Sequence, residues 1–265
     1  MPAEFVTIER RGRVAIVRFD RGDGLNPLSA RLLRELTEAA RGFEEDLETS
    51  AVVLTGAGRG FSAGRDLRDR ATSERVTKPM LERRRLAGAG ARLCRAWEEM
   101  EQFTIAAIEG FAIGGGLALA AACDFRVMAQ GAHFRAPEIG LGLSMSWGSI
   151  PRLVALVGPA RTKQILLMAN DRIAAADALA WGLAQSVVPD GQALERAVAL
   201  AEKVAAMPPL TVRMTKQSVN AVAHALSAAL IHMDTDQVML TETTRDFAEG
   251  VAAFRERRSP SFSGG

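Results

Sequence analysis

The chain has little of the chemistry that would indicate a disulfide scaffold, a membrane protein or a nucleic-acid-binding protein. It holds only 2 cysteines in 265 residues, too few for a disulfide framework. Its net charge of +2 is too small to make nucleic acid or an anionic membrane the main partner. It also lacks a run of ~18 apolar residues without charge, which a membrane-spanning helix would need. These absences favour an ordinary soluble protein.

Several short motifs are missing as well. The first residues lack the apolar core of a signal peptide, so we expect a cytoplasmic protein. Neither GxGxxG nor GxxxxGK[ST] occurs, which argues against a dinucleotide fingerprint and a phosphate loop. The 3 histidines show no metal-ligand spacing, and no metal site is predicted. The chain is nevertheless long enough to bury a large core.

The most informative stretch is residues 104–127. Residues 104–108 have the composition of a buried strand, and residues 117–123 contain only Leu, Ala and Cys. A helix there would be apolar on every face and must be surrounded by protein. Three glycines, 114–116, precede it, and the unpaired N–H groups of a bare helix start suit an oxyanion or a phosphate. On the triplet alone, a glycine turn made for tight packing is an equally good interpretation.

Strand and helix patterns alternate over the first ~190 residues and give way to helices alone. Alternating apolar residues at 5–9 and 14–19 predict a hairpin, and a helix is predicted after residues 26–29. Further strands are predicted at 51–55, 104–108, 125–128 and 186–188, the first two of them buried, and further helices at 161–168, 174–182 and 193–207. From residue 211 onward no strand pattern occurs. We therefore predict an α/β fold with a core at 1–195 and a helical region at 196–265.

A second glycine-rich loop, residues 60–66, follows the predicted strand at 51–55. The two glycine-rich loops would lie at the ends of neighbouring strands and could combine their backbone N–H groups. A pair of N–H donors directed at one oxygen is an oxyanion hole.

The sequence resembles the crotonase superfamily, that is, the enoyl-CoA hydratase/isomerase family, over nearly its whole length. The stretches that carry the resemblance are residues 20–28, FSAGRDL at 61–67, GFAIGGGLALAAACDFRV at 110–127, PEIGLGL at 137–143, IPRLVALVG at 150–158, the helix–WGL–VVP pattern at 174–189 and EGVAAFRERRSPSF at 249–262. The resemblance implies a spiral of repeated strand–strand–helix turns. It also implies C-terminal helices that assemble homotrimers or dimers of trimers.

The resemblance further implies an acyl-CoA substrate whose thioester carbonyl is held by two backbone N–H groups, so that an enolate can form. The matching N–H groups here belong to Arg65 and Gly115. No separate cofactor is expected, because coenzyme A is part of the substrate. Arg59 and Arg68 stand where relatives place cations for the CoA phosphates, and charge-assisted contacts favour that role. The remaining residues predicted to bind substrate or CoA are Leu25, Ala63, Trp147 and, from a neighbouring subunit, Arg257.

Carboxylates distinguish the possible reactions. Hydratases of the family carry two glutamates twenty residues apart; here the second is Glu138, but the first position holds Ala118. Eight residues beyond Glu138, where relatives hold water with a glycine or carry an acid, stands Ser146. Ser146 is predicted as catalytic, with a hydroxyl bonded to loop backbone as the alternative. Trp147 either lines the acyl pocket or packs in the core.

One glutamate favours double-bond isomerisation, with Glu138 as acid and base. Hydration, or hydration followed by cleavage, remains an alternative within the same enzyme class. A second alternative is a catalytically impaired homologue that binds CoA or RNA, because a fold does not by itself establish an activity.

Overall fold

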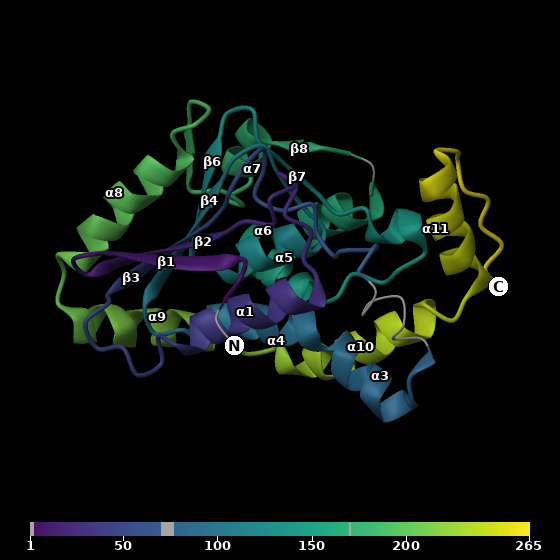
Figure 1. Ribbon diagram of the computed structural model, residues 1–265, viewed down its shortest axis with the longest axis horizontal. Helices are drawn as coiled ribbons and strands as arrows, with labels where there is room; N and C mark the ends of the chain where they lie inside the picture. The colour runs from purple at the N-terminus through teal and green to yellow at the C-terminus, as the bar shows by residue number, and fades with distance from the viewer. Residues whose placement is uncertain (1–2, 70–76, 170) are drawn as a thin grey trace.

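The computed structural model describes residues 3–69, 77–169 and 171–265, which form an α/β fold around a six-stranded sheet (Figure 1). The strand order is β1-β2-β3-β4-β6-β9. The predicted hairpin is confirmed, because β1 and β2 are antiparallel, whereas every later neighbouring pair is parallel. The other predicted strands are confirmed too; those at 51–55 and 104–108 are buried as predicted, whereas the strand at 186–188 is half-buried. The bounds are Val6–Arg11 (β1), Val14–Phe19 (β2), Ala51–Gly56 (β3), Phe103–Ile108 (β4), Phe125–Ala129 (β6) and Ser186–Val188 (β9).

The helices agree with the predicted pattern except around residue 158. Ser29 caps the first helix, since its hydroxyl accepts the Leu32 N–H at 3.3 Å. The predicted helix at 161–168 corresponds to the second part of α6. Helix α6 begins at Ser149 and is kinked at Gly158, whose φ of 74° and ψ of 168° are not helical and which Pro159 follows. The helices are α1 (Ala30–Arg41), α3 (Met80–Ala87), α4 (Ala89–Glu99), α5 (Gly115–Ala122), α6 (Ser149–Leu167), α7 (Ala175–Ala180), α8 (Ala193–Ala205), α9 (Pro209–Ala223), α10 (Ala228–Thr241) and α11 (Arg245–Glu256), with a short 3₁₀ helix η2 (Glu138–Leu141).

Both faces of the large sheet are covered, which explains the continuous apolar runs of its central strands. Successive side chains of a strand point to opposite faces. Val52 and Leu54 of β3 therefore belong to the larger core, together with residues of α1, α4 and α5. Ala51 and Val53 belong to a smaller core beneath α8. In Figure 1, α8 lies toward one end of the molecule and α11 lies at the other.

A second, three-stranded sheet was not predicted from the sequence. It consists of β5 (Phe111–Ile113), β7 (His133–Arg135) and β8 (Ile173–Ala174), in that order. Strands of two or three residues are too short for a periodic pattern. Strand β5 pairs in parallel with β7, and Ser62 forms a bridge with Ala112 of β5. The chain segments that follow Ser62, β5 and β7 therefore leave the small sheet at the same edge.

The helical region after residue 207 packs back onto the rest of the chain. Helix α10 contacts α3, and α11 contacts η2. Helix α8 spans the predicted boundary between residues 195 and 196 and packs on the large sheet; the division into a core and a helical region remains a prediction. Among the helices described, none has the length and apolar character needed to cross a lipid bilayer.

Candidate active site

The two glycine-rich loops lie side by side, as predicted. Gly64 has φ 85°, and a Cβ atom placed on it would come within 2.5 Å of the Ile113 carbonyl oxygen and 3.3 Å of the Gly115 nitrogen. Both the positive φ and the close approach require glycine at this position. The Ile113 N–H also donates to the Ser62 carbonyl at 2.9 Å. The loop at 60–66 is thereby fixed against the start of α5.

Two backbone N–H groups are free at this junction. Within the described residues, neither the Arg65 N–H nor the Gly115 N–H donates a hydrogen bond to a protein group. Gly115 is the first residue of α5, where N–H groups have no partner inside the helix. Gly114 precedes it with φ 52°. The two donors suit an oxygen that carries developing negative charge.

A cavity of 590 Å³ opens at this junction. Of the ten residues predicted for the site, six line it: Ala63, Arg65, Gly115, Glu138, Ser146 and Trp147. The four others do not. Leu25 is exposed, with its carbonyl accepting the Ala63 N–H at 2.8 Å, and Arg59 packs its side chain against Gly24. The exposed Arg68 lies after the glycine-rich loop at 60–66, and the exposed Arg257 lies at the C-terminal end of α11.

Glu138 projects its carboxylate into the junction from the first residue of η2. The Oε1 atom lies against Gly114, so closely that a Cβ atom there would overlap it. The Oε2 atom is buried and has no hydrogen-bond partner in the described residues. Burial raises the pKa of this carboxyl from 4.5 to about 7, although the nearby Arg135 charge opposes the shift. A carboxyl that titrates near neutrality can take up and release protons during a reaction.

Within the described part of the chain, no second acid lines the cavity opposite Glu138. Among the described residues that line the cavity, Glu138 is the only carboxylate, and Ala118 presents a methyl group one turn after Gly115. The Ser146 carbonyl accepts the hydroxyl of Ser149 at 2.6 Å. The Ser146 hydroxyl has no hydrogen-bond partner among the described residues, so the alternative of a backbone-bonded hydroxyl is not what the structure shows. The described residues also contain no cluster of three potential metal ligands.

Sequence reasoning missed the part of the cavity wall that comes from the C-terminal region. Val238 of α10 and Phe254 of α11 line the cavity, as do Arg258, Ser259, Pro260 and Phe262 of the segment that follows α11. Carboxylates of α11 hold this segment: Glu249 accepts the Ser261 N–H at 2.8 Å, and Asp246 accepts the Ser263 N–H at 2.7 Å. The resemblance of residues 249–262 to the family was the one sequence feature that could have indicated this part of the cavity wall.

Two of the three consecutive arginines at 83–85 in α3 form ion pairs with acidic residues of the C-terminal region. Arg83 lies 3.5 Å from the carboxylate of Glu242, and Arg65 lies 3.2 Å from the same carboxylate. Arg84 pairs with Asp236 at 2.6 Å. Arg83 and Arg84 therefore attach α3 to α10 and its C-cap residue Glu242, and Arg65 attaches the glycine-rich loop at 60–66 to the same Glu242 carboxylate. Sequence spacing could not reveal these contacts.

The geometry agrees with comparisons to known proteins. The sequence model of the enoyl-CoA hydratase/isomerase family matches residues 9–265. The short-chain-enoyl-CoA hydratase of Clostridium acetobutylicum is 34% identical, over 96% of this chain and 95% of that protein. The crotonyl-CoA hydratase of Syntrophomonas wolfei is 33% identical, over 99% of each.

Solved structures show the same relationship. An enoyl-CoA hydratase from Mycobacterium avium subsp. paratuberculosis superposes with a TM-score of 0.88 at 27% identity, over 99% of this chain and 100% of that one. The carnitinyl-CoA hydratase of Mycobacterium avium gives a TM-score of 0.85 at 31% identity, over 98% of both chains. The fold is the crotonase fold. This chain therefore belongs to the enoyl-CoA hydratase/isomerase family, a family of enzymes.

Proposed function

We propose that the protein acts on an acyl-CoA thioester through an enolate and that its preferred reaction is the shift of a double bond from C3 to C2. The observation that carries this proposal is the position of Glu138, the only carboxylate among the described residues that line the cavity, beside two N–H groups that donate to no described residue. Coenzyme A enters as part of the substrate, and the chemistry uses no resident cofactor.

In this proposal Glu138 is the base and then the acid. Its carboxylate removes a proton from C2 of a 3-enoyl thioester, and the electron pair moves onto the thioester oxygen as a dienolate forms. The same carboxyl returns the proton at C4, which leaves a 2-enoyl thioester and restores the ionised base. A pKa of about 7 suits a group that must both accept and donate a proton at neutral pH.

The N–H groups of Arg65 and Gly115 would stabilise the dienolate oxygen. Losing one such donor typically costs ~10²–10³ in rate. Base and donor are close neighbours here, because Glu138 lies against Gly114 and Gly115 follows directly. A substrate held by Gly115 would therefore place its C2 hydrogen toward Glu138.

Isomerisation is favoured over hydration because water addition needs a second group to hold and deprotonate the water. The family's hydratases use a second glutamate at the position of Ala118, and here the methyl group supplies no acid–base function. Ser146 could donate a hydrogen bond to a water molecule but is too weak a base to replace a carboxylate.

Hydration is the second candidate, because relatives at 33–34% identity are named hydratases. A panel of 2-enoyl-CoA and 3-enoyl-CoA thioesters, with products identified by mass and absorbance, separates the two reactions. Conversion of 3-enoyl to 2-enoyl thioester without mass change supports isomerisation, whereas rapid gain of one water by crotonyl-CoA overturns it. Binding without any turnover would instead indicate a catalytically impaired homologue that binds CoA.

We also propose a homotrimer or a dimer of trimers. Helices α9 and α10 expose a series of apolar side chains, namely Leu210, Met214, Val219, Val222, Met233 and Leu240. Exposed apolar surface on this scale is usually covered by another protein surface, and closed symmetry is the common solution. Sedimentation at micromolar concentration tests the assembly, and a clean monomer would contradict it.

A further inference from the structure

The indole of Trp147 packs against Gly115, one of the two residues whose N–H groups form the proposed oxyanion site. It is wedged between Gly90 of α4 and Gly115 of α5, and a Cβ atom on either glycine would overlap the ring. The side chain is nearly buried, with 9% of the residue exposed, yet it lines the cavity. Two glycines on separate helices therefore provide the space that this ring fills.

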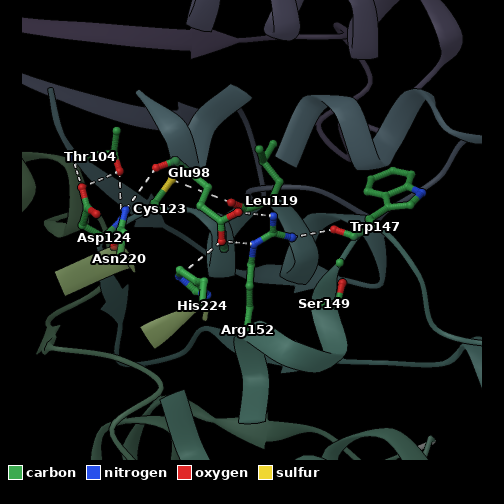
Figure 2. Close-up of polar contacts among 12 residues, drawn as sticks. Glu98, Thr104, Leu119, Cys123, Asp124, Trp147, Ser149, Arg152, Asn220 and His224 are labelled. Carbon is green, nitrogen blue, oxygen red and sulfur yellow. Dashed lines mark hydrogen bonds and ion pairs between the residues drawn. The ribbon is translucent and has the colours of Figure 1, made fainter. Parts of the chain in front are cut away.

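Trp147 occupies an unusual backbone conformation that buried polar groups hold in place. Its φ is 64°, a region that is unfavourable for a bulky residue. The carboxylate of Asp234, from α10, accepts the backbone N–H groups of Trp147 and Gly148, the latter at 3.0 Å. Arg152 donates to the Trp147 carbonyl at 2.6 Å (Figure 2).

Arg152 is itself fixed. Its Nε and Nη2 atoms donate to the two oxygens of Glu98 at 2.6 Å and 2.7 Å, and its side chain is 3% exposed. Figure 2 shows the Trp147 carbonyl directed at this guanidinium while the indole points away from it. The backbone of Trp147 is thus held through its N–H by one buried group and through its carbonyl by another, which determines where the ring lies.

We propose that Trp147 is a specificity-determining residue that restricts the enzyme to thioesters without a substituent at C2. This inference rests on the proposed acyl-CoA site but not on the choice between isomerisation and hydration. An oxygen bonded to the Gly115 N–H lies ~3 Å from the nitrogen, which places C1 and C2 within van der Waals reach of a ring that covers Gly115. A methyl branch at C2 would meet the indole, while a hydrogen fits.

The direct test compares the affinities of butyryl-CoA and 2-methylbutyryl-CoA by calorimetry, because neither saturated thioester can be turned over as an enoyl substrate. The unmodified protein should bind the branched thioester roughly 10- to 100-fold more weakly. Trp147→Ala should bring the two affinities within about threefold of each other, and Trp147→Phe, which keeps an aromatic ring, should retain most of the difference.

The outcomes distinguish this inference from the proposed function. Equal affinities in the unmodified protein overturn the role of Trp147 and leave the acyl-CoA site standing. Failure to bind either thioester overturns both. The comparison in the unmodified protein decides the matter even where Trp147→Ala does not fold, as a Trp→Ala change in a core can be severe.

Asp234 would act as a positioning residue. Asp234→Ala keeps the Trp147 side chain but removes the acceptor of the N–H groups that hold its backbone, so the ring is no longer held in position. Discrimination against the branched thioester should therefore fall about tenfold, while affinity for butyryl-CoA stays within about threefold. Asp234→Asn keeps one acceptor and should restore part of the discrimination. A purely structural role for Asp234 would instead weaken both affinities together, and that result would contradict the positioning role.

Discussion

The carboxylate of Glu138 rests against the α-carbon of Gly114, the residue immediately before the first residue of α5. Parallel pairing of β5 with β7 produces this relationship, because the Gly114 N–H donates to the Arg135 carbonyl at 2.8 Å and Glu138 follows three residues later. The glycine therefore has two functions. It permits φ 52°, and it leaves room for the carboxylate.

Gly114→Ala should reduce activity by displacing the Glu138 carboxylate, since the new methyl group would occupy the position of Oε1. General acid–base catalysis typically contributes ~10²–10⁴ in rate, and we expect a loss in the lower part of that range. Steady-state kinetics with a 3-enoyl-CoA measures the loss. Affinity for a saturated acyl-CoA should change much less, and a parallel loss of both would indicate that the helix start had collapsed.

Glu138→Gln should remove activity by ~10²–10⁴ while preserving acyl-CoA affinity, because glutamine is isosteric but cannot take up the proton. In the unmodified enzyme the base must be ionised in the resting state. Since burial raises its pKa to about 7, kcat/KM should rise with pH and level off above about 7. Measurement of kcat/KM between pH 5 and 9 tests this rise. A flat profile, or full activity in Glu138→Gln, would contradict the role of Glu138 as base.

The same carboxyl should make stability depend on pH. The folded pKa of about 7 exceeds the ordinary glutamate value of 4.5, so between these values the folded state holds a proton that the unfolded state has lost. The free energy of unfolding should therefore fall as pH rises from about 4.5 to about 7 and stay constant above that, by about 1–3 kcal/mol.

Urea unfolding of the unmodified protein and of Glu138→Gln at pH 5 and pH 8 isolates this contribution. The free energy of unfolding of Glu138→Gln, relative to that of the unmodified protein, should be higher at pH 8 than at pH 5. Identical pH dependence in the two proteins would show that Glu138 is not desolvated in solution.

Gly115→Val should abolish thioester binding, because a branched side chain at the first residue of α5 would obstruct the helix start and collide with the Trp147 ring. Gly42→Ala is the matched control: Gly42 has helical φ and ψ of −61° and −14° at the C-terminal end of α1 and is not among the described residues that line the proposed site. Calorimetry with a saturated acyl-CoA measures both variants. Unchanged affinity in Gly115→Val would exclude this helix start as the binding site.

Arg59→Ala and Arg68→Ala should each weaken CoA affinity by a few-fold to tenfold, more strongly at low ionic strength, because exposed charge contacts are modest and screened by salt. Both residues are exposed and outside the cavity, as a contact to the phosphate end of a long ligand would require. Arg85→Ala removes an exposed positive charge from nearby α3 and should leave the affinity unchanged. Equal effects of all three variants would indicate only a general electrostatic attraction.

The long, regular elements of this fold could be predicted from the sequence. The runs at 51–55 and 104–108 are apolar throughout because both faces of the sheet are covered. In the hairpin, by contrast, the edge strand β1 is exposed at every residue after Val6. The small sheet was missed since its strands are two or three residues long. That sheet brings the glycine-rich loops and Glu138 to one edge, so their meeting was predicted from resemblance and not from local pattern.

The polar groups that hold the site were beyond sequence reasoning for a different reason. Asp234 and Arg152 are separated from Trp147 by 87 and 5 positions respectively, and only the packing of α10 and α6 shows that both bind the same residue. The contact of Arg65 with Glu242, across 177 positions, is of the same kind. Spacing along a chain reports contacts within one helix or strand, whereas these pairs are set by how separate helices pack.

The two cysteines have a practical consequence for following motion in solution. Cys94 and Cys123 are both buried, and burial raises the pKa of each thiol to about 12, so thiolate is scarce at neutral pH and alkylating reagents should leave them untouched. A cysteine introduced at the exposed Ser261, beside the cavity wall, would then be the one position to accept a fluorophore or spin label. The native thiols need no replacement, and the label would report directly whether ligand binding moves this segment.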